Sequence, residues 1–220
     1  MKKFDWGSFF VNITSVVLGI FITFGIQGLI DRSQEKKDVA AALELVKEEL
    51  VNNNDNLKDV IKLVNLEKSS AISMLGNIGT LKKCDIDSVA TWNTALGTEY
   101  FFTVTDDALE LLKSSSLFQK INDKNLALGI IKAYDYLEAN SKAFNTHEQY
   151  KISLFMDANT DKAKKASGTT EGLDFLKLYY SSPEGMYFLK SVVEMSSDAF
   201  LLEGLQEIED TIANIEARQR

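Results

Sequence analysis

Cysteine, proline and histidine each occur only once in this chain of 220 residues. The single cysteine, Cys84, excludes an intramolecular disulfide and any zinc site that needs several cysteines. The single proline, Pro183, means that the residue that most often breaks helix interiors is nearly missing, so long helices are expected. A lone histidine, His147, gives little material for a metal site or a catalytic dyad.

Positive charge is also in short supply, because 24 basic residues stand against 32 acidic ones and the net charge is −8. After residue 30 the chain carries 22 basic and 31 acidic residues, so the acidity belongs to this later region. Neutralisation of phosphates supplies most of the affinity of nucleic-acid-binding proteins. An acidic region without a basic stripe therefore predicts no nucleic-acid partner.

No charged residue lies between Asp5 and Asp31. The apolar run at residues 9–30 is 22 residues long, and a rise of ~1.5 Å per residue gives it roughly 33 Å, enough to span a bilayer core. It is too long for the apolar part of a cleaved signal peptide, and buried core helices rarely extend so far without a charge. We therefore expect residues 1–30 to form a short tail and one transmembrane helix, with the lipid bilayer as a partner.

Small and polar residues form one narrow face of this predicted span, because they recur at helical spacing. They are Asn12, Ser15, Gly19, Thr23 and Gln27. Small residues let another helix approach closely, and polar residues can hydrogen-bond across the contact. This pattern predicts a homo-oligomer formed through the span or a polar pore lining, although a lone span is the alternative because glycine and threonine are common in membrane helices.

Beyond the span, apolar residues recur three and four positions apart, which indicates a long amphipathic or coiled-coil-like helix over residues 31–79. Its apolar seam comprises Val39, Leu43, Val46, Leu50, Leu57, Val60, Val64, Ala71, Met74 and Ile78. Asn53 and Glu67 interrupt the seam. Asn53 either fixes a coiled-coil register or lies near solvent in an antiparallel bundle, and we expect the second arrangement. Gly76 and Gly79 predict the end of the helix.

The remainder, residues 80–220, also reads as mostly helical. Asp87 predicts the cap of a short helix ending near Gly97, and Asp107 with Glu110 resembles a capping box. Either Asn122 or Asp123 caps a longer helix. Ser182 begins a last helix that runs nearly to residue 220, with a seam at Leu201, Leu205, Ile208, Ile212 and Ile215.

One segment does not fit the helical pattern. The run TEYFFTV at residues 98–104 is the only strand candidate outside the predicted span, or else an aromatic plug that seals the bundle. Together the patterns predict an all-α protein: one transmembrane helix, then a helical bundle with long, coiled-coil-like first and last helices.

No pattern of chemical groups rises to a predicted active site. The chain lacks the glycine-rich phosphate-binding motifs and the G-x-S-x-G nucleophile motif. Neighbouring residues point to different helix faces, so His147 and Glu148 are not expected to share a metal. The carboxylates lie among lysines at helical spacing and are expected on solvated faces. We expect no catalytic residue, no cofactor and no metal, and hence no enzymatic activity.

The order of the parts resembles an uncharacterised family of bacterial single-span membrane proteins found mainly in Bacteroidota-type genomes. The resemblance rests on the apolar span with its internal glycine, on the charged helix DRSQEKKDVAAALELVKEEL, and on the block DDALELLKSSSLFQKINDKNLALGIIKAYDYL. It implies a single anchor with a helical soluble domain, and it brings no known activity or active site. The N-terminal tail here is shorter and less basic than is usual in that family.

The sequence therefore indicates a membrane-tethered, non-enzymatic scaffold, sensor or accessory subunit that acts through oligomerisation or a protein partner. The alternative is an oligomeric pore-forming effector. The location expected is the bacterial inner membrane, with a single pass. The basic residues that flank the span, Lys2 and Lys3 on one side and Arg32, Lys36 and Lys37 on the other, are nearly balanced. The resemblance favours a periplasmic soluble domain and the short tail favours a cytoplasmic one; we expect the first.

Overall fold

The computed structural model describes the backbone of residues 6–158, 172–196 and 198–219. Side chains are described for residues 33–156, 172–196 and 198–218. Within these ranges every regular element is an α-helix or a 3-10 helix, and no β-strand is present. The prediction of an all-α helical bundle is confirmed.

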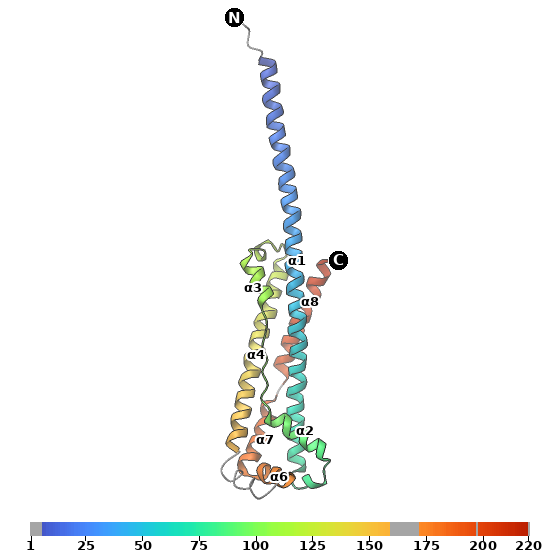
Figure 1. The fold of residues 1–220 in the computed structure, drawn as a ribbon, viewed down its shortest axis with the longest axis vertical. Helices are drawn as coiled ribbons and strands as arrows, with labels where there is room; N and C mark the ends of the chain where they lie inside the picture. Colours follow the sequence, from blue (N-terminus) through green and yellow to red (C-terminus); the bar gives the residue numbers. More distant parts are fainter. Residues whose placement is uncertain (1–5, 159–171, 197, 220) are drawn as a thin grey trace.

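Helix α1, Trp6–Asn77, is 72 residues long and forms the axis of the molecule. Its first part projects beyond the other helices, and its second part runs the full length of the bundle (Figure 1). The helix ends between the two predicted glycine stops, Gly76 and Gly79. It continues without a break across residues 30 and 31, where the predicted span and the juxtamembrane helix meet.

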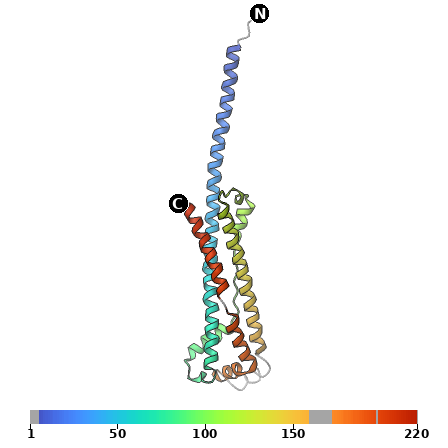
Figure 2. The ribbon, with the colours of Figure 1, turned by 180° about the vertical axis from the view of Figure 1, so that it is seen from behind.

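Two further long elements pack along α1. Helix α4, Lys124–Ala158, runs in the same direction as α1, and α8, Ala199–Gln219, runs antiparallel to it and contacts both (Figures 1 and 2). The remaining helices are short. They are η1 (Leu81–Lys83), α2 (Ile86–Gly97), α3 (Asp107–Ser114), η2 (Phe118–Lys120), α6 (Leu173–Ser181) and α7 (Pro183–Met195). Of these, α2, α6 and α7 surround the end of the bundle that is distant from the N-terminus (Figure 1).

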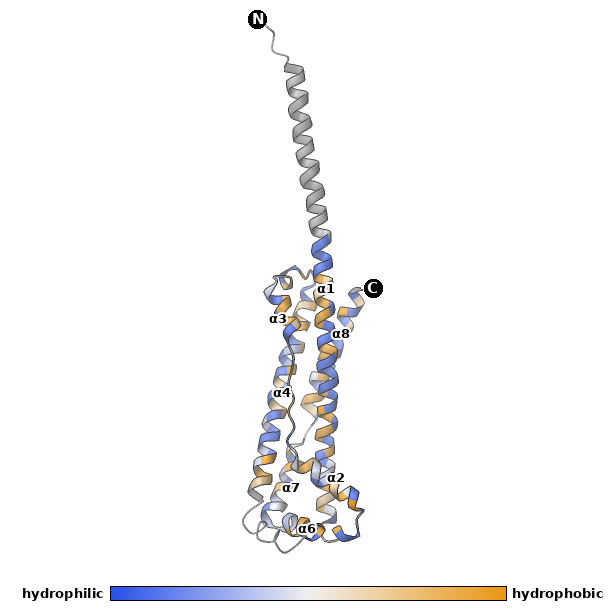
Figure 3. Ribbon diagram, in the orientation of Figure 1, coloured by the Kyte–Doolittle hydropathy of each residue, from blue (hydrophilic) through white to orange (hydrophobic). Residues whose placement is uncertain are grey.

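The buried apolar side chains form two separate clusters rather than one core. The near core joins α1, α3, α4 and α8 on the side of the N-terminus, and includes Leu50, Leu57, Leu112, Ile130, Leu137 and Ile208. The far core joins the end of α1 to α2, α6 and α7, and includes Met74, Leu96, Tyr180, Phe188 and Leu189. Hydrophobic residues of α1 recur along the length of the bundle (Figure 3). The predicted seam is buried from Leu43 to Met74, with Val39 and Ile78 partly buried.

Two predicted helix starts are confirmed by their capping hydrogen bonds. The Ser182 hydroxyl accepts from the backbone N–H of Gly185 at 3.0 Å. The Asp123 carboxylate accepts from the N–H groups of Asn125 and Leu126 at 2.8 and 3.0 Å. Each oxygen satisfies N–H groups that have no partner inside the first helical turn.

Three other local predictions are wrong. The cap of α2 is Asp85 rather than Asp87, because the Asp85 carboxylate accepts from the Ser88 N–H at 3.0 Å. No capping box opens α3, since its N-cap residue, Asp106, makes no side-chain cap bond. The predicted last helix is interrupted after Met195, so that α7 and α8 are separate helices.

Asn53 does not lie near solvent, as the sequence led us to expect, but is fully buried. Its amide nitrogen donates to the Thr105 carbonyl at 2.7 Å, and its amide oxygen accepts from the Thr105 N–H at 3.1 Å. An asparagine tolerates burial in an apolar seam when its amide group is satisfied in this way. The partner is a segment about fifty positions away in the chain.

Candidate functional site

The segment at residues 98–106 connects α2 to α3 and lies extended along α1 and α4 (Figure 1). It contains the strand candidate at residues 98–104. The strand alternative is wrong, because no neighbouring strand pairs with this segment in the described part of the chain. Its exposure nevertheless alternates as in a strand. Phe102 is buried, whereas Phe101 is 65% exposed.

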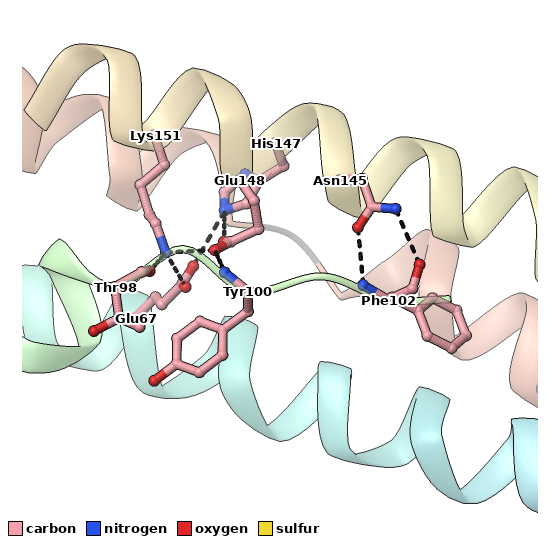
Figure 4. A network of polar contacts seen from close by, with 8 residues as sticks. All are labelled: Glu67, Thr98, Tyr100, Phe102, Asn145, His147, Glu148 and Lys151. Atoms are coloured by element: carbon pink, nitrogen blue, oxygen red, sulfur yellow. Dashed lines mark hydrogen bonds and ion pairs between the residues drawn. The ribbon is translucent and has the colours of Figure 1, made fainter. Parts of the chain in front are cut away.

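Side chains of the flanking helices take the place of a neighbouring strand. The amide of Asn145 on α4 accepts from the Phe102 N–H at 2.9 Å and donates to the Phe102 carbonyl at 3.0 Å (Figure 4). Asn53 on α1 makes the same pair of bonds with Thr105. A carboxamide has the same donor and acceptor as a peptide unit, so it satisfies an extended backbone that would otherwise be unpaired.

The candidate functional site lies where this segment crosses a group of buried ionisable residues. Glu67 comes from α1, and His147, Glu148 and Lys151 come from α4 (Figure 4). The side chains of Glu67, Glu148 and Lys151 are 0% exposed, and that of His147 is 14% exposed. Charged side chains are almost never buried so completely unless they are paired.

Lys151 joins the two carboxylates. Its ammonium group donates to Glu67 Oε1 at 2.5 Å, to Glu148 Oε2 at 2.8 Å and to the Thr98 carbonyl at 2.9 Å. These three bonds use all three donors of the ammonium group. Its nitrogen also lies 5.6 Å from the centre of the Tyr100 ring, within range of a cation–π interaction.

The outer oxygens of the two carboxylates face His147. Its Nε2 atom lies 3.2 Å from Glu67 Oε2 and 3.8 Å from Glu148 Oε1. The Tyr100 N–H donates to Glu148 Oε2 at 2.8 Å, which ties the 98–106 segment to the same group. The four carboxylate oxygens thus form two pairs. Glu67 Oε1 and Glu148 Oε2 face the ammonium group of Lys151, whereas Glu67 Oε2 and Glu148 Oε1 face the imidazole of His147.

The two carboxylates differ in acidity. Burial, supported by the charge of Glu67, raises the pKa of Glu148 to about 7, although the hydrogen bond from Lys151 opposes this. Burial also acts to raise the pKa of Glu67, but the hydrogen bond from His147 and the charge of Lys151 outweigh it and hold this pKa below its usual value. Glu67 therefore loses its proton at a lower pH than Glu148.

The ionic group occupies the boundary between the two apolar cores. On α1, Glu67 lies between Val64 of the near core and Ala71 of the far core. On α4, Phe144 belongs to the near core, whereas Phe155 packs against the far core. A polar layer at this point connects α1, α4 and the 98–106 segment by directional bonds, which apolar packing alone does not provide.

The sequence missed most of this site. His147 and Glu148 were not expected to share a metal because neighbouring residues point to different helix faces, but one ligand atom from each of Glu67, His147 and Glu148 lies within 4.8 Å of the other two. The expectation of solvated carboxylates is wrong for Glu67 and Glu148. The available signal was the charge of Glu67 inside an apolar seam, which requires a buried partner.

The other predicted site residues lie outside the part of the chain whose side chains are described. They are Asn12, Ser15, Gly19, Thr23 and Gln27. Among residues with described side chains, no helix contains a stretch long and apolar enough to cross a membrane. The charge-free run at residues 9–30 falls outside that set.

None of the protein families, curated proteins or solved structures compared with the chain matches it.

Proposed function

We propose that this protein is a non-enzymatic, membrane-anchored scaffold or sensor that acts through self-association or a protein partner. Residues 9–30 are the anchor in this proposal, and a bacterial cytoplasmic membrane is the location. The observation that carries it is the continuity of α1, which includes both the charge-free run and the buried seam of the bundle. A single helix couples the orientation of the anchor to that of the bundle, with no linker between them.

The packing around α1 supports such coupling. Its residues contribute to both apolar cores and to the ionic layer between them. Helices α2, α3, α4, α7 and α8 all contact it. Rotation or displacement of the anchor is therefore expected to act on the whole bundle, as a scaffold or sensor requires.

Self-association is tested by mass photometry of the full-length protein in nanodiscs. Gly19→Ile places a branched side chain on the small and polar face, so we expect a smaller fraction of oligomers. Ile22→Leu changes a residue on another face without altering its volume and serves as the control. Equal oligomer distributions for the two variants would refute association through this face.

The alternative is an oligomeric pore, and the polar residues Asn12, Ser15, Thr23 and Gln27 in the predicted span support it. Conductance of the purified protein in planar bilayers separates the two functions. A high-order ring with reproducible conductance supports the pore, whereas a monomer or dimer without conductance supports the scaffold.

The side of the membrane is tested at Cys84, the only thiol, which lies between η1 and α2 and is partly exposed. If the domain is periplasmic, a membrane-impermeant maleimide labels Cys84 in intact spheroplasts. Labelling only after native permeabilisation would place the domain in the cytoplasm. Labelling of the denatured protein serves as the control for reactivity.

A further inference from the structure

We propose that Glu67, His147 and Glu148 form a binding site for one divalent transition-metal ion, with Zn²⁺ as the type case. This inference concerns only the bundle and does not depend on membrane anchoring. The ion would link α1 to α4 at the boundary of the two cores.

The donor atoms have the separations that such an ion needs. Ligands ~2.0–2.2 Å from a tetrahedral Zn²⁺ ion lie roughly 3.3–3.6 Å from one another. His147 Nε2 lies 3.2 Å from Glu67 Oε2 and 3.8 Å from Glu148 Oε1. All three ligand atoms lie within 4.8 Å of one another, so small side-chain adjustments bring them around one ion. Three protein ligands leave a fourth position for water or another ligand.

A second observation points to a missing positive partner. Glu148 is 0% exposed, and its Oε1 atom has no hydrogen-bond partner among the described residues. Its neighbour oxygen, Oε2, is held by Lys151 and by the Tyr100 N–H. The carboxylate is therefore fixed through one oxygen, while the other faces His147 without a donor. Outer-shell hydrogen bonds of this kind orient the carboxylates of metal sites.

The charges of the group lead to the same conclusion. With both carboxylates ionised, Lys151 neutralises one of the two negative charges. A buried negative charge without a counter-charge is unfavourable, so a proton or a metal cation must compensate it. Lys151 already occupies the cation position formed by Glu67 Oε1 and Glu148 Oε2. The second position, formed by the other two oxygens and the imidazole nitrogen, is the proposed metal site.

The donor types select the class of metal. An imidazole nitrogen with two carboxylate oxygens suits Zn²⁺ and neighbouring transition metals, whereas Ca²⁺ and Mg²⁺ are bound through oxygens alone. Metal binding requires an unprotonated Nε2, so protons compete with the ion.

The site meets solvent at His147, whose side chain is 14% exposed. A cavity of about 150 Å³ adjoins this residue and is otherwise lined by apolar side chains that include Val64, Phe144 and Leu201. His147 is also the only member of the ionic group with an exposed fraction above zero. An ion can therefore reach the imidazole before it reaches the buried carboxylates.

The test is calorimetric titration of Zn²⁺ into the chelator-treated, full-length protein in detergent near neutral pH. We expect one ion per chain. Metal binding to the folded state alone also raises Tm, by roughly 5–10 °C at ~100 times Kd. His147→Gln should weaken binding by more than ~10-fold. Glu138→Gln removes an exposed carboxylate from the same helix and should leave binding unchanged.

Two further measurements keep the test decisive. Circular dichroism and the Tm without metal show whether His147→Gln is folded. If the variant is not folded, the unaltered protein is titrated with Co²⁺ instead and its absorption spectrum is recorded. Ligand-field bands at one equivalent indicate a site of low coordination number. The proposal is overturned if Zn²⁺ does not bind and Tm is unchanged. In that case a proton, and not a metal ion, compensates the charge of the site. Equal affinities for the unaltered protein and folded His147→Gln, or a Co²⁺ spectrum of the free aquo ion, also overturn it. The oligomer measurements of the previous subsection are independent of these outcomes.

Discussion

Asn145 on α4 pairs with both backbone polar groups of Phe102, at 2.9 Å to its N–H and 3.0 Å to its carbonyl. Phe102 itself is buried in the near core. The amide side chain of Asn145 therefore fixes the position of an aromatic core residue by hydrogen-bonding to the backbone N–H and carbonyl of that residue. This relationship explains how a helical bundle accommodates an extended segment.

Replacing that amide should destabilise the protein. In Asn145→Ala the Phe102 N–H loses its only protein partner among the described contacts, and an unsatisfied buried group costs ~1–3 kcal/mol. Urea unfolding of the detergent-solubilised protein, followed by circular dichroism, measures the loss. Thr146→Ala alters the adjacent exposed residue and should change the unfolding free energy by less than ~0.5 kcal/mol. Similar values for the two variants would show that the amide pairing does not stabilise the segment.

Lys151 should be among the most sensitive positions of the bundle. Lys151→Met leaves Glu67 and Glu148 buried without the ammonium group between them, and breaking a buried ion pair typically costs ~3–5 kcal/mol. Lys142→Met, an exposed position on the same helix, is the control. Adding Glu148→Gln to Lys151→Met should recover part of the loss, because it removes one of the unpaired charges. A loss below ~1 kcal/mol in Lys151→Met would contradict the assigned role.

Two glycines should respond to alanine in opposite directions. A Cβ atom on Gly185 would collide with the Tyr179 carbonyl and would lie 2.9 Å from Tyr180 Cα, so Gly185→Ala should destabilise by ~1–3 kcal/mol. Gly76, near the end of α1, has no such neighbour within 4 Å. Gly76→Ala should stabilise by up to ~1 kcal/mol through its higher helix propensity. Thermal unfolding of both variants checks the signs, and a stabilising Gly185→Ala would contradict the close contact.

Asp123 should contribute stability that disappears in acid. The backbone N–H of Leu126, and then Arg218, lower the pKa of Asp123 below its usual value of 3.8. A carboxyl group whose folded pKa is lowered stabilises the native state above its unfolded pKa, and this contribution is lost as the pH falls through the folded pKa. Asp123→Ala should thus lower the free energy of unfolding near neutral pH, and this loss should shrink below about pH 4.

The matched control for Asp123 is Asp59→Ala. Asp59 is exposed, and among the described residues its ion pair is with Lys62, one turn away on the same helix, so its loss should have little effect at any pH. Urea unfolding near neutral pH and in acid checks both variants. A pH-independent cost of Asp123→Ala would contradict the role of its charge.

The periodic parts of the fold were predictable from the sequence. Three- and four-residue spacing located α1 and α8, and the capping residues Ser182 and Asp123 located the starts of α7 and α4. These features depend on neighbours in the chain, which the sequence shows directly. The break between α7 and α8 was missed, although the polar run Ser196, Ser197 and Asp198 interrupts the apolar pattern there.

The candidate site was largely unpredictable, for a physical reason. Glu67 meets Lys151 across 84 positions of sequence, and Asn53 meets Thr105 across 52. Such pairs depend on how helices pack and not on spacing within one helix. The 98–106 segment shows the alternation of a strand because its backbone is extended, but its hydrogen-bond partners are side chains. Sequence alternation alone cannot distinguish these two kinds of partner.

The central claim is that residues 9–30 anchor the protein in a membrane, and carbonate extraction of membranes from expressing cells tests it most directly. The full-length protein should remain in the pellet after the alkaline wash, together with a known integral protein. A variant without residues 1–30 should appear in the supernatant as a helical protein. Release of the full-length protein into the carbonate supernatant would contradict the anchor.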